Sequence, residues 1–396
     1  MNFFSQALAI TALNLRNVPR RLGNSLVIVI GVAGAVGVFI PIVAMSMSFR
    51  ATIKGDGNDS RAIVLTPRAT SESDSSLTRD EVAMIVDYRG VSRDSHDRPV
   101  ASGEVVLVAP VSRKRDQSDV NVTLRGVSAQ YFAMRPELKL RSGRMFEPGK
   151  QELVVGAGAV SQFDGLDIGE NIRLQDGDWK VVGTFAGGNG ARESELVADA
   201  LIVMSAYKLN SFNSLTVELR SPHEFAAFKD AVNLSSKSLL LARSEPEYLE
   251  TASGSVNRIL RLVAYSIGSI MALGAMFAAL NSMYSAVSAR SVEMATLRAL
   301  GFASSAVAVG VLLEALLLAL IGAAIGAAFA YALSNGATIS TLGGAVWDSQ
   351  MVYSLAITPS LAIGVVVLAC ALGLAGGLLP ALRAARANIA EVLHEN

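Results

Sequence analysis

The residues with the chemistry to recognise another molecule gather in one short segment, SARSVEMATLRALGFASS, at residues 288–305. It carries Arg290, Glu293 and Arg298, whereas the long stretches on either side carry almost no charge. Charges at helical spacing can form ion pairs and hydrogen bonds with a partner protein. They equally suit a structural helix at a membrane surface, so both interpretations stay open at this point.

The same segment has the signals of a helix that is fixed at both ends. Ser291 predicts the N-cap, and Gly301 predicts the stop, in a left-handed conformation. Glu293 in the first turn and Arg298 in the last turn both suit the helix dipole. Arg290 and Glu293 have the spacing of an ion pair across one turn. We therefore expect a rigid helix that is capped at both ends.

One acidic residue, Glu314, lies alone inside an apolar stretch. An ionisable group in the middle of a bilayer is costly, so it usually faces protein or water. Glu314 could relay protons, bind a cation or hydrogen-bond to a neighbouring helix, and we favour the last of these.

Signals for catalysis are absent from the sequence. The only histidines, His96, His223 and His394, are far apart, and neither H-E-x-x-H nor G-x-S-x-G occurs. The segment PGKQE at 148–152 lacks the upstream glycine and the Ser or Thr of a phosphate-binding loop. We expect no catalytic residue, no metal site and no ATP hydrolysis by the chain itself. Nothing in the sequence predicts nucleic-acid binding.

The elements around these residues are those of a membrane protein. Hydrophobic residues make up 51% of the chain and charged residues 17%, with a mean hydropathy of +0.42. Soluble domains carry about 25% charged residues. About 20 apolar residues suffice to cross the hydrocarbon core. The sequence predicts spans at 22–49, 259–287, 303–333 and 356–382.

The basic residues in the short flanks predict the orientation. Lys and Arg accumulate on the cytoplasmic side. Arginines occur before the first span, within the 288–302 loop and within the tail at 383–396. The 334–355 loop has no Lys or Arg, and Asp348 is its only charged residue. Both termini and the 288–302 loop are therefore expected in the cytoplasm. We expect residues 1–21 to form an amphipathic helix at that surface, with a frayed leader as the alternative.

Residues 50–258 would lie outside and have the pattern of an α+β domain. Segments such as GEVVLVAPV (103–111) and DVNVTLRGV (119–127) are typical of strands. LTRDEVAMIVDY (77–88) and SPHEFAAFKDAV (221–232) predict capped helices. A hairpin turn is expected at Asp176-Gly177-Asp178, and a mobile, exposed loop at AGGNGARESE (186–195). The domain contains no cysteine, because Cys370, in the fourth span, is the only one.

Small residues at four-residue spacing predict close helix packing in the membrane. Gly322 with Gly326 forms one such pair and Gly373 with Gly377 another. These pairs could form a dimer interface or a seam within the bundle, or reflect ordinary packing of alanine-rich helices.

The order of these motifs resembles the FtsX/MacB-like (type VII, mechanotransmission) ABC transporter permeases. ARSVEMATLRALGFASS is similar to their signature between the second and third helices, and GGLLPALRAARANIAEVLHEN to their C-terminal ending. Glu314 is similar to the acid that opens the third helix in many members. TLRGVSAQYF and WKVVGTF resemble parts of their periplasmic core. The chain departs from the pattern at Ala295, where glycine is common, and at Asn388-Ile389.

This resemblance implies a polytopic fold of four membrane helices, with a large α+β periplasmic domain between the first and second. The 288–302 loop would hold the coupling helix that fits a separate ATP-binding subunit. Arg290, Glu293 and Arg298 would supply polar contacts, Leu297 and Leu300 the apolar anchor, and Gly301 the stop. ATP and Mg would be bound by that subunit, and no cofactor by this chain. An inserted lobe is expected at about 126–213.

Two classes of function are compatible with this resemblance. The first is export or extraction of a hydrophobic substrate (a lipid, lipoprotein, peptide or drug) at a bacterial inner membrane, with a second permease copy or paralogue. A periplasmic adaptor, an outer-membrane channel and membrane lipids are the further partners expected there. The second is a signal transducer that activates a cell-wall hydrolase or senses a peptide. An outer domain of roughly 200 residues favours the first, and a structural anchor without an ATPase is the third interpretation.

Overall fold

The computed structural model describes two compact units of the chain. The residues described are 6, 10–12, 22–55, 57–175, 177–187, 191–235, 240–340 and 352–386. The helical unit comprises Met1–Met47, Ile259–Ala337 and Leu355–Asn396. The domain unit comprises Ser48–Arg258 and Thr338–Ser354.

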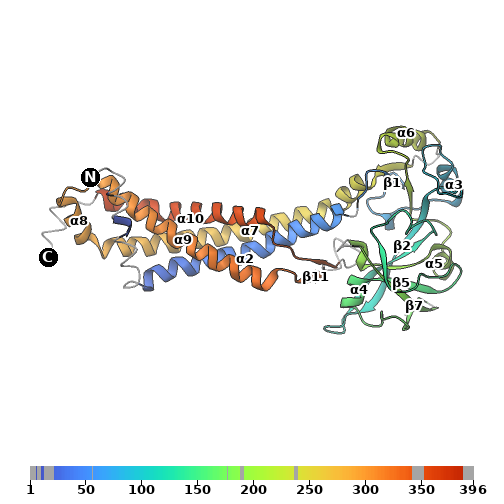
Figure 1. Cartoon of the computed structure of the whole chain (residues 1–396), viewed down its shortest axis with the longest axis horizontal. Coiled ribbons are helices and arrows are strands. Elements are labelled where there is room, and N and C mark those ends of the chain that lie inside the picture. The colour runs from blue at the N-terminus through green and yellow to red at the C-terminus, as the bar shows by residue number, and fades with distance from the viewer. Residues whose placement is uncertain are drawn as a thin grey trace. The chain divides into compact units, whose positions relative to one another are not determined.

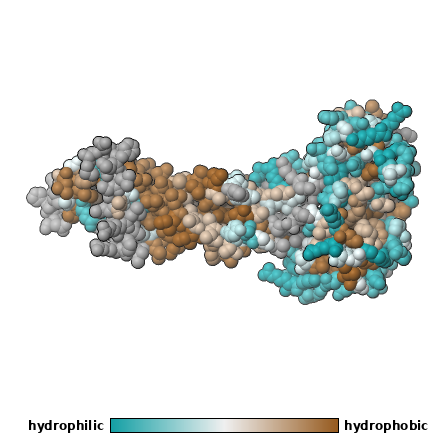
Figure 2. All heavy atoms as spheres, viewed as in Figure 1, coloured by the Kyte–Doolittle hydropathy of each residue, from teal (hydrophilic) through white to brown (hydrophobic). Residues whose placement is uncertain are grey.

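The described part of the helical unit is built from long apolar helices that lie side by side (Figure 1). The long helices are α2 (Leu22–Gly55), α7 (Glu245–Ser288), α9 (Ser304–Ser334) and α10 (Pro359–Arg386), and the short helix α8 (Ser291–Ala299) lies between α7 and α9 in the chain. Four of them are long and apolar enough to span a membrane, with spans at Ser25–Thr52, Arg258–Ser288, Ser304–Ser334 and Ser360–Arg386. The fold class expected from the sequence is confirmed in this respect. Hydrophobic residues dominate the visible face of these helices, whereas the visible face of the domain unit is mainly hydrophilic (Figure 2).

Three of the spanning helices extend beyond the apolar runs of the sequence. α2 continues to Gly55, α7 begins as early as Glu245, and α10 continues to Arg386. Hydropathy marks only the part of a helix that suits lipid, and helical hydrogen bonds continue into polar surroundings. Most of the amphipathic helix expected at 1–21 lies outside the described residues; of those described there, Ile10 is buried against Gly310 of α9.

The domain unit contains a ten-stranded sheet, in the order β10-β1-β9-β2-β3-β8-β5-β7-β4, with β6 paired to β7. The strands are β1 (Arg61–Leu65), β2 (Ala101–Ser112), β3 (Asp119–Val127), β4 (Lys139–Gly143), β5 (Glu152–Gly156), β6 (Asn171–Leu174), β7 (Gly177–Ala186), β8 (Leu196–Asp199), β9 (Ser214–Glu218) and β10 (Leu241–Ser244). The β3–β8 and β5–β7 pairs are parallel, and the other pairs are antiparallel. In addition, β11 (Thr338–Ser340) pairs antiparallel with β12 (Val352–Ser354).

Short helices cover this sheet. They are η2 (Glu72–Asp74), α3 (Arg79–Val86), α4 (Ala157–Gln162), η3 (Ala191–Ser194), α5 (Ala200–Ala206), η4 (Pro222–Glu224) and α6 (Phe225–Ser235). The expected helices at 77–88 and 221–232 are confirmed as α3 and as η4 followed by α6. Thr78 and Glu81 form a capping box at the start of α3, so two backbone N–H groups are satisfied there.

The two largest apolar clusters of the domain unit lie beside different parts of the sheet, and strand β2 passes both. Ala101–Glu104 of β2 pair with β9, and Val105–Ser112 pair with β3. The first cluster packs β1 and β9 against α3 and α6. The second runs from Val105 to Met204 and includes Trp179. This second cluster therefore combines residues of β2 and β3 with residues of the lobe expected at about 126–213.

Two local expectations for the domain are wrong. The β6–β7 hairpin exists, but Leu174 lies opposite Gly177, so Gly177 and Asp178, expected in the turn, already belong to β7. The segment 186–195 is not an exposed loop throughout, because η3 forms at 191–194 and Arg192 and Glu195 are buried. The sequence marks this segment as polar, but it does not show that its charges are paired inside the domain.

Candidate functional site

The helix expected between the second and third spans is α8, and both of its ends are defined. Arg290 occupies the N-cap position without a side-chain cap, so the cap predicted at Ser291 is wrong. At the other end the N–H of Leu300 bonds to the carbonyl of Thr296, at 3.0 Å. Gly301 follows with φ +94°, the left-handed conformation that glycine adopts without strain. α8 is thus a short helix with a fixed stop.

An ion pair ties the start of α8 to the middle of the helical unit. Arg290 Nη2 donates to both carboxylate oxygens of Glu314 in α9, at 3.0 and 2.7 Å. Its Nε donates to the carbonyl oxygen of Ala286 in α7, at 3.2 Å. Arg290 is 3% exposed and Glu314 5%. Arg290 thereby links the end of α7 to α9, and the partner that we expected for it, Glu293, is replaced by Glu314.

The remaining residues of α8 divide into an inner and an outer face. Met294 and Ala295 are buried, and Leu297 packs against the apolar core of the helical unit. Leu300 is 73% exposed and Glu293 is exposed as well. The outer face thus has Leu300 as its prominent apolar residue, whereas Leu297 is partly buried against the core of the helical unit.

The glycine pairs lie at contacts between helices of this chain. A Cβ on Gly322 would lie 2.7 Å from the carbonyl oxygen of Val29 in α2, and one on Gly326 would clash with Ala33. Gly373 faces Leu316 and Ala319 of α9. Gly377, one turn further, faces Ala315 of α9. These glycines therefore let α2, α9 and α10 approach closely within the bundle.

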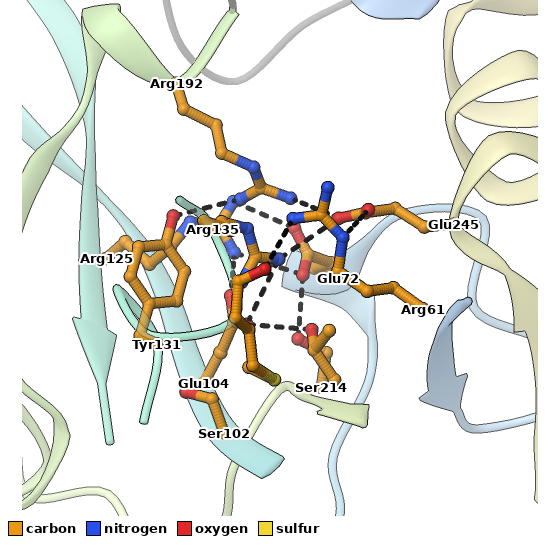
Figure 3. A network of polar contacts seen from close by, with 12 residues as sticks. Arg61, Glu72, Ser102, Glu104, Arg125, Tyr131, Arg135, Arg192, Ser214 and Glu245 are labelled. Carbon is orange, nitrogen blue, oxygen red and sulfur yellow. Dashed lines mark hydrogen bonds and ion pairs between the residues drawn. The ribbon is translucent and has the colours of Figure 1, made fainter. Parts of the chain in front are cut away.

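The sequence did not reveal the second notable arrangement, a buried network of charges in the domain unit (Figure 3). At one centre, Arg125 of β3 bonds to Glu195 through Nε and Nη2, at 2.8 and 2.9 Å. It also bonds to both oxygens of Glu72, at 3.1 and 3.0 Å, and to Glu104 at 2.6 Å. One guanidinium thus joins η2, β2 and the segment after η3.

The other centre of the network is the carboxylate of Glu245, the first residue of α7. Its Oε1 accepts from Arg135 Nη2 at 3.1 Å and from Arg192 Nη2 at 3.2 Å. Its Oε2 lies 2.8 Å from Arg61 Nε and accepts from the backbone N–H of Asn58 at 3.1 Å. Glu245 is 0% exposed. A buried carboxylate is tolerated when it is paired and hydrogen-bonded in this way.

The two centres are in contact through Arg135. Its Nη2 lies 3.7 Å from Oε1 of Glu104, and its guanidinium lies 4.3 Å from the ring centre of Tyr131. Arg192 Nη1 donates to the hydroxyl of Tyr131, at 3.2 Å. The aromatic ring therefore supports two arginines of the network, through cation–π and hydrogen-bond contacts.

Glu72 and Arg125 hold each other in their charged forms. Burial opposes the ionisation of Glu72, but Arg125 outweighs it and lowers the pKa of Glu72 to about 2. Burial also opposes the charge of Arg125, yet Glu195, Glu72 and Glu104 raise its pKa well above the usual value. The pKa of Tyr131 is raised by burial. The phenol of Tyr131 therefore stays neutral, and the carboxylate of Glu72 stays paired with the guanidinium of Arg125.

The geometry does not favour catalysis by these residues. Among the described residues, no group of three or more His, Cys, Asp or Glu could hold a metal ion. His96 is exposed in a turn, His223 is exposed in η4, and His394 lies outside the described residues. Charges that are held this firmly suit mechanical linkage better than proton transfer. A sequence signal does exist in hindsight, because Arg61, Glu104 and Arg125 each stand next to or within an apolar strand run.

Two protein-family models match the chain. Residues 24–234 match the MacB-like periplasmic core domain, and residues 265–389 match the FtsX-like permease C-terminal family. No curated protein sequence matches at a significant level.

Among solved structures, the chain is similar to the extracellular domain of the noncanonic ABC-type transporter YknZ from Gram-positive bacteria. The identity is 14%, the TM-score 0.36, and the match covers 46% of this chain and 99% of that one. It is also similar to the periplasmic region of MacB from Actinobacillus actinomycetemcomitans. There the identity is 13%, the TM-score 0.38, and the match covers 52% and 97%.

Proposed function

Because the chain belongs to the FtsX/MacB-like family of ABC transporter permeases, we propose that it is the membrane subunit through which a separate ATPase chain moves the domain unit. α8 is the coupling helix and fits a cleft on that ATPase. ATP and Mg are bound by the partner, and this chain is not itself an enzyme. Two copies of the permease, or this one and a paralogue, stand on two ATPase subunits.

The observation that carries this proposal is the way α8 is held. Its inner face packs on the helical unit, and the Arg290–Glu314 pair ties its start to α9. Its outer face presents Leu300 and Glu293. A helix that must push on the bundle needs a rigid attachment on one side and a contact surface on the other. An ordinary loop between two spans needs neither.

The output of this movement is export or extraction of a hydrophobic substrate on the outer side of a bacterial inner membrane. The arginines in the flanks support a cytoplasmic position for α8 and both termini. The domain then lies in the periplasm, where an adaptor and an outer-membrane channel can receive the substrate. The match of residues 24–234 to a MacB-like periplasmic core domain supports this arrangement.

Affinity purification of the full chain in mild detergent, followed by mass spectrometry, tests the proposal. A P-loop ATPase should be purified with the native chain. It should be lost from a Glu293→Arg, Arg298→Glu double variant and weakened by Leu300→Asp. Arg173→Glu with Asp178→Arg is the matched control, because these exposed residues lie opposite each other on β6 and β7.

Two results would contradict the proposal. One is purification of an assembled, folded chain without any ATPase, and the other is equal recovery of ATPase with the coupling variants and the control. A bound cell-wall hydrolase in place of an adaptor would support the signal transducer instead of the export pump.

A further inference from the structure

Glu245 is held by more partners than a helix start requires. α7 is one helix from Glu245 to Ser288, and its last part, Arg258–Ser288, is a candidate membrane span. A carboxylate in the first turn already benefits from the helix dipole, and one serine or threonine is enough to cap a helix. Glu245 instead has three arginines and a backbone N–H around it.

These arginines come from three separate parts of the domain unit. Arg61 begins β1, Arg135 lies between β3 and β4, and Arg192 belongs to η3. Figure 3 shows their guanidinium groups converging on Glu245 from different segments. Arg61 also forms an ion pair with Glu137, at 2.9 Å, so the contacts extend beyond these three segments. A pull on the first turn of α7 would therefore reach β1 and η3 directly.

A second segment of the chain meets the same part of the domain unit. β12 packs beside η3, which carries Arg192, and beside α4. β12 is the element that directly precedes α10 in the chain, and Glu245 is the first residue of α7. Two segments that continue into membrane-spanning helices thus lie against elements that the network joins.

We infer that Glu245, Arg61, Arg135 and Arg192 form a mechanical anchor, through which movement of α7 is passed to the sheet of the domain unit. The inference rests on the proposed function, because that function supplies the movement. Glu245 is a positioning residue in this scheme and touches no substrate.

Charged hydrogen bonds suit this role better than apolar packing. Apolar surfaces can slide past each other, whereas hydrogen bonds of fixed direction resist both translation and rotation. Arg135 depends on Glu245 in particular. Within the described residues, its Nε and Nη1 make no hydrogen bond, and its other carboxylate, Glu104, is 3.7 Å away. Shortening or neutralising Glu245 therefore loosens several attachments at once.

Distance measurement between two spin labels tests the anchor in the full chain. Cys370, the only cysteine, is first replaced by serine. Labels are then placed at Glu247 of α7 and Arg173 of β6, both exposed. Glu245→Gln removes the charge, and Glu245→Asp keeps the charge but shortens the side chain. Glu250→Gln is the matched control, because its side chain is 73% exposed on the same helix.

In the native and control chains we expect one narrow distance, which a non-hydrolysable ATP analogue does not change when the ATPase is present. In the Glu245 variants we expect a broader distribution, and a distance that changes with the analogue because α7 moves without the sheet. Should Glu245→Gln fail to fold, Glu245→Asp still reports the effect.

Failure of the anchor and failure of the proposed function give different results. The anchor is overturned if both Glu245 variants keep the narrow, unchanging distance of Glu250→Gln. If no ATPase binds the native chain, the proposed function fails, but the breadth of the distribution without nucleotide still tests the attachment of α7.

Discussion

The two units of the chain both bury arginine and glutamate, but they arrange them differently. The helical unit has the pair of Arg290 and Glu314, set among small and apolar side chains. In the domain unit Arg125 alone contacts three glutamates, and Glu245 contacts three arginines. The pair ties one short helix to its bundle, whereas the network ties many segments together.

This difference teaches how each unit would respond to the loss of one charge. In a network, a removed group leaves several opposite charges facing one another without compensation. In a pair, it leaves one, and both partners can be replaced together by apolar residues. We expect the network to be the less tolerant of the two to substitution, and the following predictions test that comparison from the largest effect to the smallest.

Arg125→Leu should have the largest effect. Removing one partner of a buried ion pair costs about 3–5 kcal/mol, and here Glu72, Glu104 and Glu195 all lose their contact with Arg125. Since whole domains are stable by only about 5–15 kcal/mol, the domain unit should be largely unfolded. Thermal melting followed by circular dichroism would measure this. Arg173→Leu, an exposed arginine on β6, is the control, and equal melting of the two variants would contradict the prediction.

Glu314→Leu should destabilise the helical unit less, because only Arg290 is left without its carboxylate. We expect a loss toward the lower end of the same range, about 3 kcal/mol. The double variant Arg290→Met, Glu314→Leu should recover most of this stability but not the binding of the ATPase, because α8 is no longer tied by charge. Melting in detergent and the purification described above measure the two effects. If the double variant is no more stable than Glu314→Leu, the contrast between an isolated pair and a network is contradicted.

Acid should weaken the domain unit through Glu72. The pKa of Glu72 lies at about 2 in the folded domain, below its ordinary value of 4.5. A lowered pKa means that the stabilisation is complete above 4.5 and is lost as the pH falls toward 2. Melting temperatures measured across that interval should decrease, and Glu72→Gln should remove part of the decrease. An unchanged pH profile in that variant would show that other groups cause the loss.

Gly326→Ala should have the smallest effect. The new Cβ would overlap Ala33 of α2, and overpacking of this kind costs about 1–3 kcal/mol. Gly364→Ala in α10 is the matched control, because its Cβ would meet no heavy atom within 4 Å. Melting of the two variants in detergent compares them. If they melt alike, close contact between α2 and α9 does not limit the stability of the helical unit.

Much of the fold follows from local patterns in the sequence. Apolar runs indicate the four spans, because any helix that crosses lipid needs about 20 such residues. Thr78 and Glu81 indicate the start of α3, because the capping box is formed within four residues. Gly301 indicates the end of α8 in the same way, through its left-handed backbone.

Other features were decided only when distant segments met. Arg290 was three residues from one glutamate in the sequence, yet it pairs with Glu314 in the next helix. Leu297 is partly buried against the core of the helical unit, because the orientation of α8 depends on its packing against the neighbouring helices. Such choices depend on packing between helices, which local spacing does not contain.

The sequence by itself determined four apolar spans, an α+β domain between the first two, and a short helix that ends before Gly301 between the next two. Only the tertiary structure decided which charges meet, as Glu72 with Arg125 and Glu245 with Arg192. The physical reason is the distance along the sequence over which each interaction acts. Helix caps and hydrophobic runs act over a few residues, whereas a buried ion pair needs a partner brought by the fold from anywhere in the chain.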